Sequence, residues 1–555
     1  MKWERFDLPA GPRLTDAYVH QKDPRVAELF GYHPEEPASW ERRAKRLDQT
    51  VSSRADASEL ADALHIYNSK WQEPSGRAAH NIQLLGAGAL AIVGGQQAGL
   101  WTGPLMVIHK AVSIIQAARR ASADLQRPVV PIFWIAGEDH DWEEAGHTYL
   151  VSSKPSLQKL SVNRSAANRT SVSRTKLLQA DWDRALQQLA AALPDYEYKP
   201  EFMNRLHALA EQADSLPEMF AGIMSWLFGQ EGLVLLDADD PSLRRLESPM
   251  FKRLIAQNDE LESALAEAAA QIAGMEYDVQ AAAAPGSANL FVYLEDDNNS
   301  SNDYSGDRIL LHKSEGEFAD RKGLFSASSE QLMTIAEEHP ERLSNNVLTR
   351  PIMQDYVLPV LATVLGPGEI AYWAMTGKAF QVFGMEMPIV VPRMSFTIIE
   401  PTSQKHMERF GLPSLSDIMS RVGPRKRELL EEWGDPSLDG RFDEVTSAMM
   451  ELYEPLLQMA ADGRPPIAAL VETNKRKIVA QIEFIRGRVN DEISKKHERA
   501  LRQLDRLQTV LWPDGKPQER VINFAEYWAR YECLWIKQLF EVPHDWRGGH
   551  HIVYL

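Results

Sequence analysis

The chain of 555 residues contains a single cysteine, Cys533, which lies in an apolar, aromatic-rich segment. One cysteine excludes an intrachain disulfide framework and any zinc site built from several cysteines. It also fits a protein that works in a reducing compartment. We therefore interpret Cys533 as a buried structural residue rather than as a catalytic thiol.

Long hydrophobic runs are also missing. No stretch approaches the roughly 18 consecutive apolar residues that a membrane-spanning helix needs. The first residues, MKWERFDLPAG, contain no apolar segment of the kind found in secretory signal peptides. Together with the cysteine count, these absences predict a cytoplasmic protein without a membrane partner.

Positive charge is in deficit, because 60 Lys and Arg residues face 78 Asp and Glu residues, which gives a formal net charge of -18. Proteins that bind nucleic acid through its phosphates normally carry a basic surface, so we expect no nucleic-acid partner.

Two catalytic signatures are absent as well. The sequence has neither the G-x-S-x-G turn of serine hydrolases nor the Walker A lysine loop of P-loop ATPases.

What the sequence does contain is a set of short apolar segments typical of buried strands. A length of 555 residues predicts about two to four domains or one elaborated core. Strands are predicted at Leu90–Val93, Pro128–Ala136, Gly232–Ala238, Asn289–Glu295, Glu369–Ala374 and Pro388–Val391. Nearly continuous apolar runs of this kind favour parallel strands covered by helices on both faces, and therefore an α/β fold. The run from Val347 to Ala362 is interpreted as a loop and a helix.

The stretch from Ala89 to Ile115 joins the first predicted strand to a helix predicted over residues 104–121. Between them lies a glycine-rich loop, Gly94–Gly99, and Pro104 occupies the first helical position. A strand, a glycine loop and a helix N-terminus together offer backbone N–H groups and a positive dipole end to an anion. The stretch thus predicts a phosphate site, to which His109 and Lys110 would add charge. The alternative is an ordinary tight turn.

A polar cluster directly follows the second predicted strand. Its members are Glu138, Asp139, His140, Asp141, Glu144 and His147. Because ligands of parallel sheets bind at the carboxyl ends of strands, we expect this cluster to lie beside the glycine loop. His140, between two aspartates, is suited to moving a proton. Two alternatives stay open: a metal site that uses His140, His147 and a carboxylate, and a solvated loop.

Beyond about Pro401 the strand signals stop and the charge density rises. An apolar seam runs through Ile478, Ile482, Ile485, Val489 and Ile493, flanked by charges of both signs. It predicts one helix of roughly 45 residues, about 65 Å long. A shorter helix over 442–461 precedes it across 462–466, so we expect an antiparallel coiled-coil arm that dimerises. The tail is core-like, and residues 548–555 are predicted to form an edge strand.

Four groups of motifs are spread along nearly the whole chain. The first is GGQQAGL at 94–100 with the residues up to Lys110, and the second is FWIAGEDHD at 133–141. A third group comprises Arg350-Pro351, Gln354-Asp355, Leu358-Pro359, Gly366-Pro367, Glu369–Trp373 and Pro392-Arg393. The fourth lies in the tail, at Gln518–Arg520, Asn523 and Val553–Leu555. In this order, the motifs resemble those of the bacillithiol-synthesis cysteine-adding enzyme family.

This resemblance implies a ligase that adds L-cysteine to glucosaminyl-malate through an amide bond, in the last step of bacillithiol biosynthesis. ATP is the implied co-substrate, with Mg²⁺. The implied fold is a Rossmann-like nucleotidyltransferase core, similar to class I aminoacyl-tRNA synthetases, with connecting insertions and a coiled-coil arm that supports a homodimer. The implied division is a core over 1–400 with insertions at about 145–230 and 245–350, an arm over 401–510, and a segment over 511–555 that packs back on the core.

The loop, the acidic cluster and the resemblance together give the candidate site residues. The expected catalytic residues are His109, Asp139, His140 and Asp141. The residues expected to bind substrate or nucleotide are Gly95, Gln96, Gln97, Gly99, Thr102, Gly103, Lys110, Trp134, Glu138, Glu369, Tyr372 and Arg393. A candidate second nucleotide site comprises Lys516, Gln518, Arg520 and Asn523. No metal site made of protein ligands alone is expected.

Three hypotheses follow for the function. The first is an ATP-dependent cysteine ligase that acts in the synthesis of a thiol cofactor. The second is a non-catalytic, dimeric nucleotide-binding module. The third and weakest is a metal-dependent hydrolase that uses Glu138, His140 and His147.

Overall fold

The computed structural model describes residues 2–8, 11–72, 75–152, 154–164, 168–281, 284–295, 304–433, 436–461 and 465–555. Its internal contacts divide the chain into two units. The first unit comprises Met1–Leu150, Gln158–Ile398 and Gln518–Leu555, and the second comprises Val151–Leu157 and Ile399–Pro517. Part of the connection predicted within the arm, residues 462–464, lies outside the described residues.

A five-stranded parallel sheet lies at the centre of the first unit. In the order β13-β12-β2-β3-β6, its strands are β13 (Ile389–Pro392), β12 (Val360–Leu365), β2 (Leu90–Gln96), β3 (Val129–Ile135) and β6 (Val234–Asp237). Every residue of β3 is buried, as its continuous apolar run predicts. The strands predicted at 90–93, 128–136, 232–238 and 388–391 are therefore confirmed.

Two predictions next to this sheet need correction. The helix predicted within residues 347–362 exists as α14 (Arg350–Val357), but residues 360–362 belong to the strand β12, whose β-branched residues suit a strand buried on both faces. Glu369–Ala374, predicted as a strand, belongs largely to helix α15 (Pro367–Trp373). Pro367 is the first residue of that helix, and the Glu369 carboxylate accepts a hydrogen bond from the Gly366 N–H at 2.7 Å. Residues 367–373 therefore form a helix because Pro367 and Glu369 stabilise its first turn.

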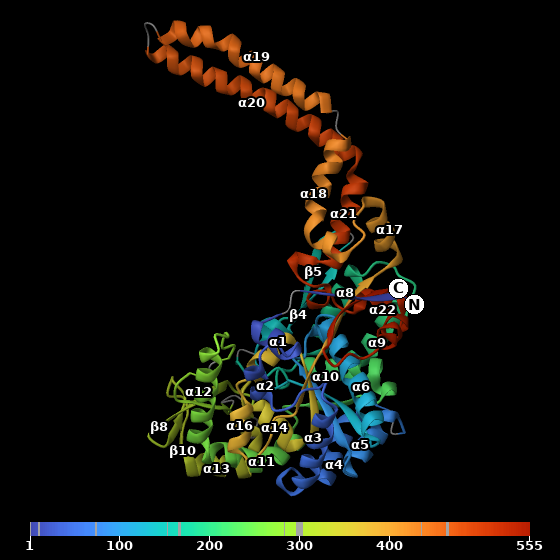
Figure 1. The fold of residues 1–555 in the computed structure, drawn as a ribbon, viewed down its shortest axis with the longest axis vertical. Coiled ribbons are helices and arrows are strands. Elements are labelled where there is room, and N and C mark those ends of the chain that lie inside the picture. The colour runs from blue at the N-terminus through green and yellow to red at the C-terminus, as the bar shows by residue number, and fades with distance from the viewer. Residues whose placement is uncertain are drawn as a thin grey trace. The chain divides into compact units, whose positions relative to one another are not determined.

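Helices surround the central sheet (Figure 1). Those packed directly on it include α3 (Pro37–Gln49), α4 (Ala57–Ser69), α5 (Arg77–Gly86), α6 (Met106–Leu125) and α10 (Leu216–Phe228). Besides α15, the other α-helices among the described residues of this unit are α1 (Arg13–Val19), α2 (Pro24–Phe30), α7 (Trp142–Ala145), α8 (Gln179–Ala192), α9 (Lys199–Ala210), α11 (Pro241–Ala256), α12 (Asn258–Gly274), α13 (Ser329–Glu338), α14 (Arg350–Val357), α16 (Gly377–Val382), α22 (Ala525–Tyr531) and α23 (Leu534–Glu541).

A second, antiparallel sheet is inserted between β6 and β12. In the order β10-β9-β8-β7-β11, it contains β10 (Ser326–Ser328), β9 (Glu317–Ala319), β8 (Arg308–Ser314), β7 (Ser287–Tyr293) and β11 (Leu343–Asn345). The strand predicted at 289–295 is β7, so it exists but lies outside the parallel sheet.

The chain ends come together in a three-stranded sheet of order β1-β15-β14. Its strands are β1 (Lys2–Phe6), β15 (Gly549–Tyr554) and β14 (Met394–Ile399). The prediction of an edge strand at the carboxyl end is wrong, because β15 is paired on both sides. A separate pair is formed by β4 (His147–Val151) and β5 (Leu157–Ser161).

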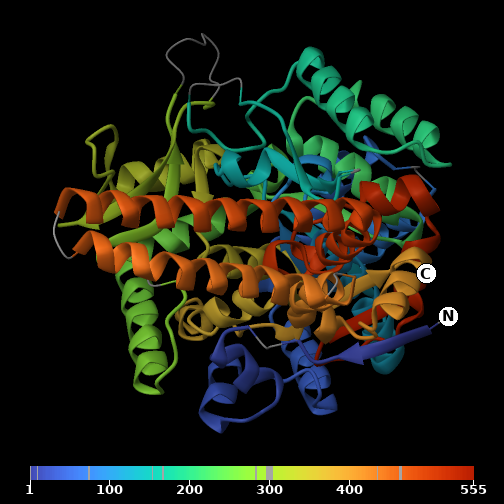
Figure 2. The same cartoon turned by 90° about the horizontal axis from the view of Figure 1, so that it is seen from above.

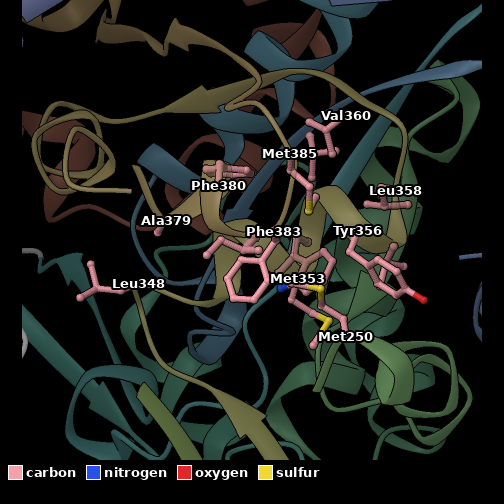
Figure 3. Close-up of a cluster of buried hydrophobic side chains, with 14 of the residues drawn as sticks. Met250, Leu348, Met353, Tyr356, Leu358, Val360, Ala379, Phe380, Phe383 and Met385 are labelled. Atoms are coloured by element: carbon pink, nitrogen blue, oxygen red, sulfur yellow. The ribbon is translucent and has the colours of Figure 1, made fainter. Parts of the chain in front are cut away.

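One part of the hydrophobic core joins the inserted region to the start of β12 (Figure 3). Met250 of α11, Met353 of α14 and Phe383 after α16 lie together and are each less than 5% exposed. Leu358 and Val360 continue the cluster at the entry of β12. Burying one such side chain contributes about 1.5–3 kcal/mol. The cluster therefore fixes β12 against the inserted helices.

Among the described residues of the second unit after Glu400, the secondary structure is helical. This unit contains α17 (Pro401–Phe410), α18 (Leu415–Trp433), α19 (Pro436–Ala461), α20 (Pro465–Lys496) and α21 (Glu498–Leu511). The long helices α19 and α20, orange to red in Figures 1 and 2, lie side by side. The prediction of a single helix of about 45 residues is wrong, because α20 ends at Lys496 and α21 begins at Glu498.

The apolar seam of α20 is present with one exception. Ile478, Ile482 and Val489 are half-buried, whereas Ile485 is 54% exposed. The side chain of Ile493 lies outside the described residues. Within the part of the chain that the structure describes, no helix combines the length and apolarity that crossing a membrane requires.

Candidate functional site

The path of the chain through the parallel sheet marks one place for a ligand. From β2 the chain proceeds to β3 and β6 on one side, and it then returns to β12 and β13 on the other. The order thus reverses between β2 and β12. In sheets of this type, ligands bind outside the carboxyl ends of the strands at such a reversal.

The glycine-rich stretch has a different local structure from the one predicted. β2 extends to Gln96, and Gly94 and Gly95 pair with Phe133 and Trp134 of β3. A Cβ at Gly95 would lie 2.7 Å from the Trp134 carbonyl oxygen, so this glycine permits close strand packing. The N–H of Gly99 donates to the Gln97 carbonyl at 3.1 Å. The predicted glycine loop at 94–99 therefore does not offer its N–H groups to an anion as expected, because Gly95 belongs to the strand and the Gly99 N–H has an acceptor within the protein.

The turn before α6 is strained and buried. Trp101, Thr102 and Gly103 all have positive φ, at 50°, 66° and 71°. For a β-branched residue such as Thr102 this conformation is rare and costs free energy. The N–H of Gly103 donates to the Leu100 carbonyl at 2.8 Å, so it too is used internally. Helix α6 begins at Met106 rather than at Pro104.

The carboxyl-terminal segment covers this turn. The side-chain amide of Asn523 donates to the carbonyls of Trp101 at 2.8 Å and Gly103 at 2.6 Å, and it lies 3.1 Å from the Thr148 hydroxyl. The Leu105 N–H donates to the Ile522 carbonyl at 2.8 Å. The start of α6 is thus closed by protein, which does not suit an open phosphate site there.

The acidic cluster does lie beside the end of β2. Gln96 pairs with Ile135 in the sheet, and the Gln97 side-chain amide donates to the Asp139 carboxylate. The other oxygen of Asp139 accepts from the backbone N–H of His140 at 2.7 Å and of Asp141 at 3.3 Å. The predicted adjacency of the two strand ends is confirmed, with Asp139 and Gln97 in direct contact.

His140 meets a residue from the inserted sheet. Arg308, the first residue of β8, approaches the His140 Nδ1 atom to 3.2 Å. Burial is the main cause that lowers the His140 pKa, and the positive charge of Arg308 adds to it. The imidazole is 29% exposed, so it is both held by protein and accessible.

Glu138 points away from this edge and into the protein. Its carboxylate is 2.6 Å from the guanidinium of Arg244, which also pairs with Glu247 at 2.7 Å. Arg244 is completely buried, and Glu138 is 4% exposed. Glu138 therefore serves a buried ion network in this structure and is a poor candidate for direct contact with a substrate.

The remaining members of the cluster lie at the surface. Asp141 caps the short helix α7 by accepting from the Glu144 N–H at 3.1 Å. His147 bonds through Nδ1 to the Glu143 carbonyl at 2.5 Å. Glu138, His140 and His147 thus have separate partners. Among the described residues, no group of three His, Cys, Asp or Glu side chains is arranged to hold a metal ion.

A second polar group lies at the same edge, between β2 and β12. The Lys110 amine donates to the Gly95 carbonyl at 2.6 Å, the Gln96 side chain at 3.0 Å and the Glu369 carboxylate at 2.6 Å. Burial lowers the Lys110 pKa, while Glu369 opposes this effect. The Glu369 side chain is 25% exposed. Arg350, half-buried nearby, lies 3.4 Å from the Tyr372 hydroxyl, and burial raises the Tyr372 pKa.

Three further predicted residues are internal. His109 is completely buried and bonds through Nδ1 to the Glu519 carboxylate at 2.6 Å. Arg393 holds the same carboxylate with two hydrogen bonds of 2.7 Å. Burial lowers the His109 pKa. Burial alone would raise the Glu519 pKa, but the charge of Arg393 outweighs it and holds the Glu519 pKa well below its usual range. A phosphate contact by His109 does not fit this burial. Trp134 is also completely buried.

The residues predicted as a second nucleotide site differ in exposure. Gln518 is buried and exchanges hydrogen bonds with the backbone of Ile398, at 2.8 and 3.1 Å. Asn523 is buried and clamps the turn before α6, as described above. Lys516 and Arg520 are exposed. The side-chain amides of Gln518 and Asn523 therefore make hydrogen bonds within the protein.

The structure adds residues that sequence reasoning left out of the site. Arg350 stood in a recognised motif without a role, whereas Arg308 lies in a strand with no local signal of function. The fold of the inserted sheet brings Arg308 to His140, which is 168 residues away in sequence. Gly137, next to the acidic cluster, was also left out of the predicted site. A Cβ at this position would collide with Ser173 and with Asp237 at the end of β6, so the turn after β3 requires a glycine here.

A separate hollow of about 650 Å³ lies elsewhere in the first unit. Arg42, Lys45 and Arg46 of α3 line it together with Tyr32 and Glu386. Glu386 lies three residues before β13 begins, so the hollow is near the amino end of that strand. It is not the place where the predicted site residues meet.

Comparison with known proteins gives a consistent family. The model described as "Bacillithiol biosynthesis BshC, N-terminal Rossmann-like domain" matches residues 1–394. The model described as "Bacillithiol biosynthesis BshC, C-terminal coiled-coil domain" matches residues 396–555. Both fit the α/β unit and the helical unit seen here.

Similar full-length proteins carry one name, "Putative cysteine ligase BshC". The protein of Geobacillus thermodenitrificans is 33% identical over 557 residues, and that of Bacillus thuringiensis subsp. konkukian is 32% identical over 557 residues. In both cases the alignment covers 100% of each chain. The protein of Bacillus cytotoxicus is 31% identical over 497 residues, or 90% of each chain.

Proposed function

The chain belongs to the BshC family of bacillithiol biosynthesis, and from this premise we propose that it is a cysteine ligase. In the proposed reaction, L-cysteine is joined to glucosaminyl-malate through an amide bond, the last step of that synthesis. One observation carries the proposal. Two consecutive glutamines at the end of β2 connect the two polar groups, because Gln96 contacts Lys110 and Gln97 contacts Asp139.

This edge has the charges that the substrates require. Cysteine and glucosaminyl-malate each bring an amino group and at least one carboxylate. Asp139 and Glu369, both partly exposed, can hold an ammonium group. Arg350 can bind a carboxylate or a phosphate through its guanidinium fork. We therefore place both substrates between the ends of β3 and β12, on either side of β2.

ATP with Mg²⁺ is the proposed source of free energy, because an amide does not form from a free carboxylate in water without activation. Mg²⁺ would be held mainly by the nucleotide phosphates and would need few protein ligands. The reversal of strand order between β2 and β12 supports a nucleotidyltransferase-like core. The glycine stretch and His109 are not included in this assignment, since their polar groups are occupied or buried.

The residues of the chain would act mainly through position and charge. As the new C–N bond forms, the activated C–O bond of cysteine breaks and the attacking amine loses a proton. Asp139 and Asp141 are the proposed acceptors for that proton. His140 lies next to both carboxylates and faces the same edge.

The arm is proposed to be an antiparallel hairpin that forms the interface of a homodimer. Arg486 of α20 pairs with Asp443 of α19, and Asn474, earlier in α20, contacts Tyr453, later in α19. These contacts support opposite chain directions. We propose an arm over about 401–510, between a core over 1–400 with insertions near 145–230 and 245–350 and a closing segment over 511–555.

The test combines purified protein, cysteine, glucosaminyl-malate, ATP and Mg²⁺, with product detection by mass spectrometry. Asp139→Asn keeps the size of the side chain but removes its charge, so we expect at least about 100-fold less product per unit time. Asp124→Asn, at a side chain 61% exposed on α6, is the matched control and should leave the rate unchanged. A wild-type rate in Asp139→Asn would overturn the site assignment. Nucleotide retained without any amide product would favour a nucleotide-binding module instead.

A further inference from the structure

We propose that Arg308 is a positioning residue that fixes His140 as the tautomer protonated at Nε2. His140 would then serve the reaction as a hydrogen-bond donor and not as the base. The tautomer follows from the contacts around the imidazole alone. Its use in catalysis rests on the proposed ligase function.

Arg308 is held rigidly before it meets His140. Its Nε donates to the Ser344 hydroxyl at 2.8 Å, and one terminal nitrogen donates to the Asn345 carbonyl at 2.7 Å. Its guanidinium lies 3.8 Å from the centre of the Phe291 ring. The residue is only 7% exposed. The remaining terminal nitrogen therefore has a fixed position, 3.2 Å from Nδ1 of His140.

This contact determines where the imidazole carries its proton. A guanidinium has only N–H donors and stays charged at any pH that proteins tolerate. Its partner must be an acceptor, so Nδ1 offers its lone pair and a neutral ring carries its single proton on Nε2. Protonating Nδ1 would break the hydrogen bond and bring two cations together.

The neighbouring carboxylates do not reverse this preference. Asp139 lies 3.8 Å from Nδ1, beyond hydrogen-bond distance, and its oxygens are used by the backbone of His140 and Asp141 and by Gln97. The charged groups around His140 are Arg308, Arg169, Asp139 and Asp141. Burial and the two arginines lower the His140 pKa, and the two aspartates raise it by less. The result is a neutral ring.

A neutral ring with Nε2–H has a defined use in amide formation. Negative charge grows on the oxygens of the reacting carboxyl group, and a fixed N–H donor stabilises it. The proton lost by the attacking amine then passes to a carboxylate, for which Asp139 and Asp141 are available. The inserted sheet thereby controls the chemistry of the parallel sheet through one arginine.

The direct test observes the tautomer in the wild-type protein. Histidine labelled with ¹⁵N allows long-range ¹H–¹⁵N correlation spectra to distinguish the two neutral tautomers, and His140→Gln identifies the His140 signals among the 15 histidines. We expect the Nε2–H pattern, and a titration midpoint below the ordinary histidine pKa of about 6.5. An Nδ1–H pattern, or a midpoint at or above that value, would overturn the proposal.

Substitutions separate the hydrogen bond from the charge. Arg308→Gln should move the His140 midpoint upward and allow the Nδ1–H tautomer, whereas Arg308→Lys, which keeps a charged donor, should restore part of the wild-type pattern. Arg169→Gln is the matched control, because Arg169 is exposed and acts on His140 through charge only. It should leave the tautomer unchanged. An equal change in Arg169→Gln and Arg308→Gln would contradict the proposal.

Activity provides an independent result. If His140 is a donor, the rise of kcat/KM with pH should follow the carboxylates in the wild type. In Arg308→Gln, kcat/KM should fall at neutral pH, where the Nδ1–H tautomer leaves Nε2 without a proton, and part of this loss should disappear at lower pH, because the protonated ring again carries Nε2–H. No ligase product together with an Nε2–H pattern would refute the proposed function and leave the tautomer assignment intact.

Discussion

Glu138 and Asp139 are adjacent carboxylates with opposite environments. Glu138 turns inward to Arg244, and Asp139 turns toward Gln97 at the edge of the sheet. Nothing in the order of the two residues distinguishes them, because the direction of each side chain depends on the turn after β3 and on Arg244, 106 residues away. Sequence could predict that this cluster carries function, but not which carboxylate is available.

His109 shows the same limit. It follows Ile108 in a helix whose apolar face is buried, and the structure places His109 inside as well. Its partner, Glu519, is 410 residues away in sequence. A histidine near a helix start suggests a phosphate contact, and only the position of the tail reveals a buried ion group instead.

Asp237, at the end of β6, should make stability depend on pH. Burial raises its pKa to about 7, against about 3.9 in an unfolded chain. The folded state therefore binds more protons than the unfolded state between these values, and stability falls as pH rises from about 4 to 7. In Asp237→Asn this decline should be smaller, as measured by the urea midpoint at several pH values.

Asp240→Asn serves as a comparison for that measurement. Asp240 is three residues further on, and its pKa is raised by burial, whereas the Ser242 and Leu243 N–H groups that it caps oppose this effect. The slope in Asp240→Asn between pH 5 and 7 should therefore change less than the slope in Asp237→Asn. An unchanged slope in Asp237→Asn would show that Asp237 titrates normally.

Among the elements, the strands with continuous apolar runs were predictable and their surroundings were not. Residues 90–93 and 128–136 form neighbouring parallel strands, as their composition indicates. The glycines at 94 and 95 extended β2 instead of forming a loop, because the close approach of Trp134 and Ile114 requires residues without a side chain. Packing between elements, which a single sequence does not show, decided this point.

The turn before α6 depends on the tail, and Asn523 links the two. Asn523→Asp replaces the donating amide with an oxygen that faces the carbonyls of Trp101 and Gly103. Two buried carbonyls then lose their donor, so we expect the free energy of unfolding to fall by about 2–4 kcal/mol. The denaturant midpoint measured by circular dichroism should drop accordingly.

An exposed asparagine provides the reference for this effect. Asn490→Asp, on the surface of α20, should change the free energy of unfolding by no more than about 0.5 kcal/mol. If both variants unfold at the same denaturant concentration, Asn523 does not hold the turn. The strain at Thr102 would then need another source of stabilisation.

For the molecule as a whole, the change of texture near Pro401 correctly indicated a helical part after an α/β part. The two units divide the chain near this point, because the larger segment of the second unit begins at Ile399. Only β7 of the inserted antiparallel sheet was predicted as a strand, because β8, β9, β10 and β11 lack the long apolar runs of the parallel sheet. Its contribution to the site, Arg308, was missed for the same reason.

The arm leaves apolar side chains exposed that a second copy of the chain could cover. On α19 and α20, Leu452, Met459, Leu470 and Phe484 are between 62% and 72% exposed. Large exposed apolar groups on adjacent helices are costly in water and mark interaction surfaces. We expect the wild type to have twice the chain mass of 62.6 kDa in light scattering after gel filtration.

Charge placed on that surface should separate the subunits. Leu470→Glu combined with Phe484→Glu buries two unpaired carboxylates in any arm-to-arm interface, so the double variant should elute as a monomer with its circular dichroism unchanged. Ile66→Glu, at a residue 63% exposed on α4, adds a carboxylate outside the arm and should remain dimeric. A monomeric wild type, or a dimeric double variant, would contradict dimerisation through the arm, because either result means that these apolar side chains are not covered by a second copy.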